Sequence, residues 1–254
     1  MSEVVVETSG KVATVMLDRP PVNALTLALY QHLAEIFEEL GERQDINCVI
    51  LSARGMRAFC AGLDLREFLA AKVEDDPARG AIVRRMFAAV RHCEIPVIAA
   101  VNGPALGAGC VLASVCDIRI ASENATFALP EINVGRCGGT AHMGRHIPQG
   151  MLRRMFFTGL PIDAREAWRL GFVQEITPPD ALLSSAIALA EIIAKKAPLG
   201  LRLGKEAINK VEFMPVEDGY ALEQTYSTKL MHTEDAREAT RAVVEKRSPV
   251  FQGR

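Results

Sequence analysis

One glutamate of the chain stands in surroundings that suit proton transfer. Glu131 is flanked by Leu129, Pro130 and Ile132. An apolar environment disfavours the charged carboxylate and raises its pKa toward neutrality, where a general base works best. The residues alone leave a second interpretation open, because most glutamates with such neighbours are surface or hydrogen-bonded side chains. Glu131 is therefore a candidate acid/base group.

Two glycine-containing turns could offer backbone donors to an anion. They are Ala61-Gly62-Leu63-Asp64 and Gly107-Ala108-Gly109, and we expect each to run into the start of a helix. The first N–H groups of a helix have no partner inside it and can face negative charge. Gly107-Ala108-Gly109 lacks the third glycine of a dinucleotide-binding fingerprint. The alternatives are a packed core turn at Gly107 and a helix-capping role for Asp64, with Glu67 completing a capping box.

Metal and hydrolase chemistry find little support in the residue spacing. The five histidines form no HExxH motif, and His142 and His146, four residues apart, have no third ligand nearby in the sequence. The six cysteines contain no CxxC pair, and most stand in apolar runs where a thiol behaves as a small hydrophobe. No serine stands in a GxSxG elbow. The sequence thus predicts no metal site.

The elements that would position these residues alternate between strand and helix. Two β-branched runs separated by residues 8–11 predict a hairpin, and apolar residues at helical spacing predict helices. The predicted strands are 4–6, 12–17, 46–52, 96–101, 117–121, 124–127 and 172–176. The predicted helices begin near Thr26, Asp64, Asp75, Gly107, Gly139 and Asp163, and residues 181–247 are expected to be helical throughout. This pattern predicts an α/β body followed by an all-helical region.

The run Ile95–Asp117 has no formal charge between its ends and is long enough to be considered as a membrane span. Prolines and glycines interrupt it repeatedly, at Pro96, Gly103, Pro104 and Gly107. We therefore predict a strand to residue 101, a turn over 102–106 and a helix from Gly107, with no membrane span.

Composition indicates a globular chain with no general affinity for polyanions. It has 254 residues, 24% of them charged, and a formal net charge of -2. This balance gives no attraction for nucleic acid or anionic membranes. The start MSEVVVETSG has neither the basic nor the apolar region of a secretory signal, so we expect the cytoplasm, or an organelle matrix if a transit peptide was removed.

Taken together, these segments resemble the enoyl-CoA hydratase/isomerase, or crotonase, family. The resemblance rests on motifs in family order along nearly the whole chain: 23–25, 59–65, 96–103, 105–110, 116–118, 127–131, 157–159 and 246–251. It implies a spiral of ββα units over residues 1–196 with an acyl-CoA site. It also implies a helical region over 197–254 that assembles trimers, often paired into hexamers, and covers the CoA site. Coenzyme A would be part of the substrate, with no separate cofactor.

The resemblance also implies roles for individual residues. The backbone N–H groups of Leu63 and Ala108 would hold the oxygen of a thioester enolate, and Glu131 would move the proton. The residues expected to bind the CoA or acyl part are Ala24, Arg57, Ala61, Gly62, Asp64, Gly107, Val111, Lys246 and Phe251, the last two from this or a neighbouring subunit. For Arg57 and Lys246, a solvated surface charge is the alternative.

One position departs from the family's two-carboxylate hydratases. Val111 matches the place of their first glutamate, and Glu131 matches the second. The loop 135–139 is also about three residues shorter than usual, which leaves the acyl preference open. A single base favours double-bond isomerisation slightly over hydration. Hydration with Arg136, Cys137 or a held water in place of the missing group stays an alternative, as does a catalytically silent CoA-binding assembly protein.

Overall fold

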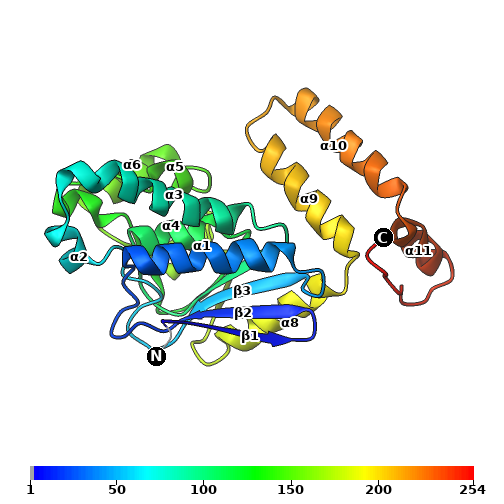
Figure 1. Cartoon of the computed structure of the whole chain (residues 1–254), viewed down its shortest axis with the longest axis horizontal. Coiled ribbons are helices and arrows are strands. Elements are labelled where there is room, and N and C mark those ends of the chain that lie inside the picture. Colours follow the sequence, from blue (N-terminus) through cyan, green and yellow to red (C-terminus); the bar gives the residue numbers. More distant parts are fainter. Residues whose placement is uncertain (1–2) are drawn as a thin grey trace.

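Two β-sheets form the body of the protein in the computed structural model, which describes residues 3–254 (Figure 1). The larger sheet contains, in spatial order, β1 (Val4–Ser9), β2 (Val12–Leu17), β3 (Cys48–Ala53), β4 (Val97–Val101), β6 (Ile118–Ser122) and β9 (Glu175–Thr177). β1 and β2 form the predicted antiparallel hairpin, and every later neighbour pairs in parallel. Parallel neighbours need crossover connections, which here contain the helices.

Helices cover both faces of this sheet because its central strands are apolar on both sides. All six side chains of β3 are buried. Since successive side chains point to opposite faces, Val49 and Leu51 join the core shared with α1 (Leu27–Glu42) and α3 (Asp76–Arg91). Ile50 joins a smaller core beneath α8 (Leu182–Ala194). The predicted α/β body is therefore confirmed.

A second, three-stranded sheet corrects the predicted turn over 102–106. It consists of β5 (Ala105–Leu106), β7 (Thr126–Ala128) and β8 (Ile162–Asp163), in that order. Ala105 and Leu106 pair in parallel with Phe127 and Ala128, a contact that a local pattern does not reveal. The last predicted strand, 172–176, lies at Glu175–Thr177 instead, because Phe172 and Val173 bond back to the Ala167 carbonyl.

Short helices connect the strands at the end of the sheet where the predicted site residues lie. They are α2 (Leu65–Ala70), the 3-10 helix η1 (Val73–Asp75), α4 (Ala108–Val115), the 3-10 helix η2 (Pro130–Val134), α5 (Thr140–Met143), α6 (Gln149–Thr158) and α7 (Ala164–Arg169). Asp64 caps α2 as predicted, accepting from the N–H groups of Arg66 and Glu67 at 3.0 and 3.1 Å. The predicted capping box is wrong in its second half. The Glu67 carboxylate accepts from the Leu27 N–H at 3.0 Å and pairs with Arg79, so it joins α2 to α1 and α3.

The C-terminal region is helical, as predicted, and extends to one side of the body (Figure 1). It contains α9 (Pro198–Val211), α10 (Val216–Met231) and α11 (Glu234–Val244). Two buried cations anchor α9. Arg202 donates to the carbonyls of Gly41 and Arg43, and Lys205 donates to the Ile95 carbonyl and pairs with Asp117 at 2.7 Å. The predicted division after residue 196 falls between α8 and α9, and the assembly role of this region stays a prediction.

The uncharged run Ile95–Asp117 is divided among β4, β5 and α4. Within residues 3–254, no helix combines the length and the apolar character needed to cross a membrane.

Candidate active site

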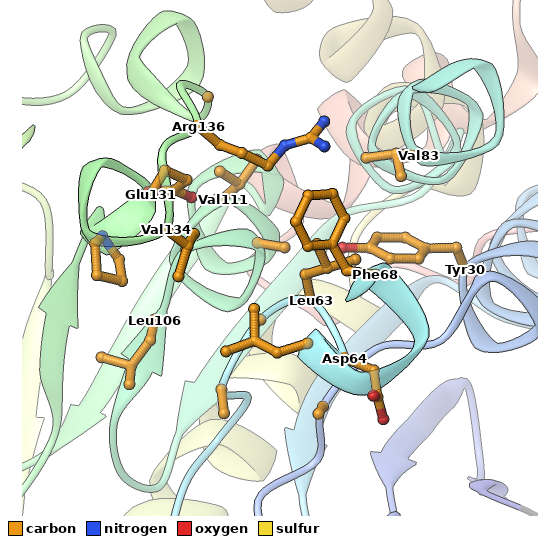
Figure 2. A pocket seen from close by; sticks show the side chains of 18 of the residues that line it. Tyr30, Leu63, Asp64, Phe68, Val83, Leu106, Val111, Glu131, Val134 and Arg136 are labelled. Atoms are coloured by element: carbon orange, nitrogen blue, oxygen red, sulfur yellow. The ribbon is translucent and has the colours of Figure 1, made fainter. Parts of the chain in front are cut away.

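A cavity of about 810 Å³ opens where α1, α2, α3, the start of α4 and η2 meet (Figure 2). Both glycine turns and Glu131 line it, so the structure brings together the candidates that the sequence singled out. Its size is that of a pocket for a small organic ligand.

The two glycine turns pack directly against each other. The Leu106 N–H donates to the Cys60 carbonyl at 2.9 Å, and the Cys60 N–H donates to the Pro104 carbonyl at 3.2 Å. Gly62 has φ +85°, and a Cβ at this position would lie only 2.6 Å from the Leu106 oxygen and 3.2 Å from the Ala108 nitrogen. Only glycine allows this close approach.

Two backbone N–H groups at these turns are left free. Across residues 3–254, neither the Leu63 nor the Ala108 amide donates a hydrogen bond, although both residues line the cavity. The neighbouring groups are used, since the Leu25 N–H donates to the Gly62 carbonyl and the Asp64 N–H donates to the Leu25 carbonyl. Ala108 begins α4 with ordinary helical backbone, so its Cβ is accommodated. Such a pair of fixed donors can stabilise an oxyanion.

Glu131 lies beside the second of these donors. Its Oε1 atom is 2.9 Å from the place where a Cβ on Gly107 would stand, and Gly107 has φ +53°. Burial raises the pKa of the Glu131 carboxyl. Its Oε2 atom is buried and has no hydrogen-bond partner within the described part of the chain. A carboxylate with one unpaired oxygen and a raised pKa, next to two free backbone donors, is suited to take up a proton.

No second carboxylate in the cavity is similarly free. Val111, one turn into α4, is 3% exposed and presents only methyl groups. The other lining carboxylates have cationic partners: Asp64 pairs with Arg19 at 2.8 Å and Asp76 with Arg136 at 3.0 Å. Of the acidic side chains that line the cavity, Glu131 is thus the one without an ion pair.

This arrangement agrees with comparisons to known proteins. The profile of the family described as enoyl-CoA hydratase/isomerase matches residues 7–254. The chain belongs to this family. It is 36% identical over 251 residues to a short-chain-enoyl-CoA hydratase of Clostridium acetobutylicum, covering 97% of this chain and 96% of that one. It is also 36% identical over 262 residues to a 2,3-dehydroadipyl-CoA hydratase of Escherichia coli, with full coverage of both chains.

The fold of this enoyl-CoA hydratase/isomerase family member is that of the crotonases. A crystal structure of an enoyl-CoA hydratase from Bacillus anthracis superposes over 100% of both chains with a TM-score of 0.96 and 34% identity. The expected crotonase fold is therefore confirmed, and the protein is an enzyme of this family. The alternative of a catalytically silent assembly protein is not supported.

The structure places most of the predicted binding residues of this family member in the cavity. Besides the catalytic candidates, the lining includes Ala24, Ala61, Gly62, Asp64, Gly107 and Val111. Three predicted residues do not line it. Arg57 is exposed beyond β3, and Lys246 and Phe251 lie in the segment that follows α11.

Some lining residues of the family member carried no sequence signal. Tyr30 belongs to the buried face of α1, and its spacing from Leu29 and Leu33 in the sequence is that of an ordinary core residue. Phe68 and Arg136 come from segments that meet only in the fold, with the Arg136 guanidinium 4.7 Å from the centre of the Phe68 ring. Their positions depend on tertiary contacts, which local periodicity does not encode.

The described residues, 3–254, hold no group of three or more His, Cys, Asp or Glu side chains placed to bind a metal ion.

Five cysteines of this family member are buried and Cys137 is exposed. Burial raises the pKa of the Cys48, Cys60 and Cys116 thiols to about 12, which keeps them protonated. These three thiols are buried, as their apolar runs in the sequence predict.

Proposed function

We propose that the enzyme transforms an acyl-CoA thioester through an enolate, with Glu131 as the group that moves the proton. The thioester oxygen would accept hydrogen bonds from the Leu63 and Ala108 amides. The observation that carries this proposal is the position of the Glu131 carboxylate against Gly107, directly before Ala108. A proton removed from carbon by Glu131 would leave its charge on an oxygen already facing two donors.

A single free carboxylate favours double-bond isomerisation. In that reaction one base takes a proton from one carbon of the acyl chain and returns it to another, two positions along. Val111 offers no proton, and Asp64 and Asp76 are held in ion pairs. Glu131 would therefore perform both transfers, and the burial that raises the pKa of its carboxyl favours uptake of the proton.

The CoA part would lie at the mouth of the cavity beside Ala24, Ala61 and Asp64. Arg66, an exposed residue that also lines the cavity, adds a cation suited to phosphate. Lys246 and Phe251 would come from a neighbouring subunit of a trimer or hexamer, because neither lines this chain's own cavity. Coenzyme A would act as part of the substrate, without a separate cofactor, in the cytoplasm.

The substitution Glu131→Gln tests the proposal. It keeps the size of the side chain and removes the transferable proton, so we expect turnover of a 3-enoyl-CoA to fall about 100-fold or more. Binding of a saturated acyl-CoA, measured by calorimetry, should be retained. Glu123→Gln makes the same chemical change at an exposed residue outside the cavity and serves as the control. Unchanged turnover in Glu131→Gln would refute the assignment.

Hydration is the second candidate, favoured by the names of the relatives, which are hydratases. It needs a group that holds water in place of the missing glutamate. Arg136 lines the cavity and could orient a water molecule, whereas Cys137 does not line it. Incorporation of oxygen from ¹⁸O-water into the product of a 2-enoyl-CoA would favour hydration. Migration of the double bond of a 3-enoyl-CoA without such incorporation would favour isomerisation.

A further inference from the structure

Tyr30 presents a hydroxyl group to an otherwise apolar wall of the cavity. The residue stands on the first turn of α1 and is only 1% exposed. Its ring packs edge-on against Phe87, with 6.2 Å between the ring centres and 82° between the planes. Figure 2 shows the hydroxyl end directed toward the cavity, which Leu63 and Phe68 also line.

The hydroxyl of Tyr30 has no hydrogen-bond partner among residues 3–254. Tyr226, which is 4% exposed on α10, shows the usual arrangement: its hydroxyl donates to Glu206 at 2.9 Å and accepts from Lys210 at 2.7 Å. The Tyr30 hydroxyl faces the cavity, so it is not cut off from solvent in the free protein. A ligand that displaces water from this wall would leave the hydroxyl buried and unpaired, at a cost, unless the ligand itself supplies a partner.

Other polar groups on this side of the cavity already have partners. Arg136 pairs with Asp76 at 3.0 Å, and Arg79 pairs with Glu67 at 3.0 Å. The remaining wall beside Tyr30 is formed by Phe68, Val83 and Phe87. Burial raises the pKa of the Tyr30 phenol, and the nearby Cys60 and Glu131 raise it further. The phenol thus stays protonated at neutral pH and is available as a donor.

The thioester oxygen does not need this donor, because the Leu63 and Ala108 amides already face it. A purely hydrocarbon acyl chain would leave the hydroxyl unpaired. We propose that Tyr30 is a specificity-determining residue whose hydroxyl donates to an oxygen atom on the acyl group. The substrate class is then an acyl-CoA that carries a hydroxyl, keto or carboxylate oxygen in addition to its thioester. This inference rests on the proposed acyl-CoA site and deepens it.

Equilibrium binding tests the inference without requiring turnover. The dissociation constants of butyryl-CoA, 3-hydroxybutyryl-CoA, 4-hydroxybutyryl-CoA and succinyl-CoA would be measured by calorimetry for the full-length enzyme and for Tyr30→Phe. At least one oxygenated ligand should bind more tightly than butyryl-CoA. Tyr30→Phe should raise the dissociation constant of that ligand by about 3- to 10-fold if its extra oxygen is neutral. The increase should exceed about tenfold if the extra oxygen belongs to a carboxylate. Butyryl-CoA should bind the two proteins equally.

Tyr226→Phe removes a paired hydroxyl outside the cavity and should change none of these constants. It should lower the melting temperature, whereas Tyr30→Phe should not, because the Tyr30 hydroxyl has no partner to lose in the free protein. Equal weakening of all four ligands by Tyr30→Phe, or no preference of the enzyme for any oxygenated ligand, would overturn the inference. Either of these two contradicting outcomes would still leave the proposed proton-transfer role of Glu131 intact. Failure of the enzyme to bind any acyl-CoA would contradict both proposals.

Discussion

Replacement of Gly62 by alanine tests whether the spacing of the two glycine turns controls the chemistry. The added Cβ would lie 2.6 Å from the Leu106 oxygen, so the turns must separate by about 0.4 Å to reach 3.0 Å, the shortest separation that Cβ atoms ordinarily show. The atoms that must move are backbone atoms next to Ala108, one of the two proposed donors. Alanine at φ +85° adds about 1 kcal/mol of backbone strain.

We expect Gly62→Ala to lower the free energy of unfolding by about 2–4 kcal/mol, as the sum of backbone strain and overpacking. Loss of one oxyanion donor typically lowers kcat about 100- to 1000-fold. A displacement of a few tenths of an ångström weakens the donor without removing it, so we expect a fall in kcat of about 10- to 100-fold. The assays are urea denaturation and steady-state kinetics with an enoyl-CoA.

Gly55→Ala is the matched control, because Gly55 has φ +86° and open space around the place of a Cβ. It should incur the backbone strain alone, about 1 kcal/mol, and leave kcat within about twofold. The reasoning fails if Gly62→Ala and Gly55→Ala lose the same stability and both retain normal kcat. In that case the close approach of the turns would not position the donors.

Two further predictions concern the carboxylates of the cavity. Because the pKa of Glu131 is raised in the folded state, its ionisation opposes folding above that pKa and has no effect below its unfolded value near 4.5. Glu131→Gln should therefore melt at a higher temperature than the wild type at pH 8, and this difference should vanish by about pH 4. Calorimetric melting of both proteins across this pH range checks the prediction. A difference in melting temperature that does not change with pH would contradict it. Val111→Glu would place a second carboxylate at a site that is 3% exposed, so it should lower the free energy of unfolding by about 1–3 kcal/mol. The new carboxylate should also raise the rate of hydration relative to that of isomerisation by at least about tenfold. The product ratio from a 2-enoyl-CoA, read by NMR, decides it, and an unchanged ratio would show that a carboxylate at position 111 is not sufficient.

The features that the sequence predicted correctly are those with a local cause. Asp64 caps α2 and Asp163 caps α7 because a carboxylate before a helix accepts from the first free N–H groups. The β1–β2 hairpin follows from two alternating runs and a short turn. The pKa of Glu131 is raised in the direction that its apolar sequence neighbours suggest, and the cause is burial of the carboxyl in the fold.

The features that the sequence did not reveal depend on contacts between distant residues. Glu67 accepts from Leu27, 40 residues earlier, instead of completing the expected capping box. β5 is a strand only because β7 lies beside it. Tyr30 has the spacing of a core residue, and only the fold shows that its hydroxyl reaches the cavity. The roles of all the predicted CoA-binding residues stay predictions, and Arg57, Lys246 and Phe251 do not line the cavity of this chain.

The anchoring of α9 has a consequence for association with other chains. Arg202 and Lys205 are 8% and 6% exposed and hold α9 through hydrogen bonds to backbone carbonyls at the end of α1 and before β4. Such charge-assisted bonds are directional, so they fix the angle of the helix as well as its position. α9 would then hold the C-terminal helices at an orientation relative to the body that is set during folding. Any partner that α10 and α11 meet would bind with little further loss of conformational entropy, which strengthens association without adding a single contact.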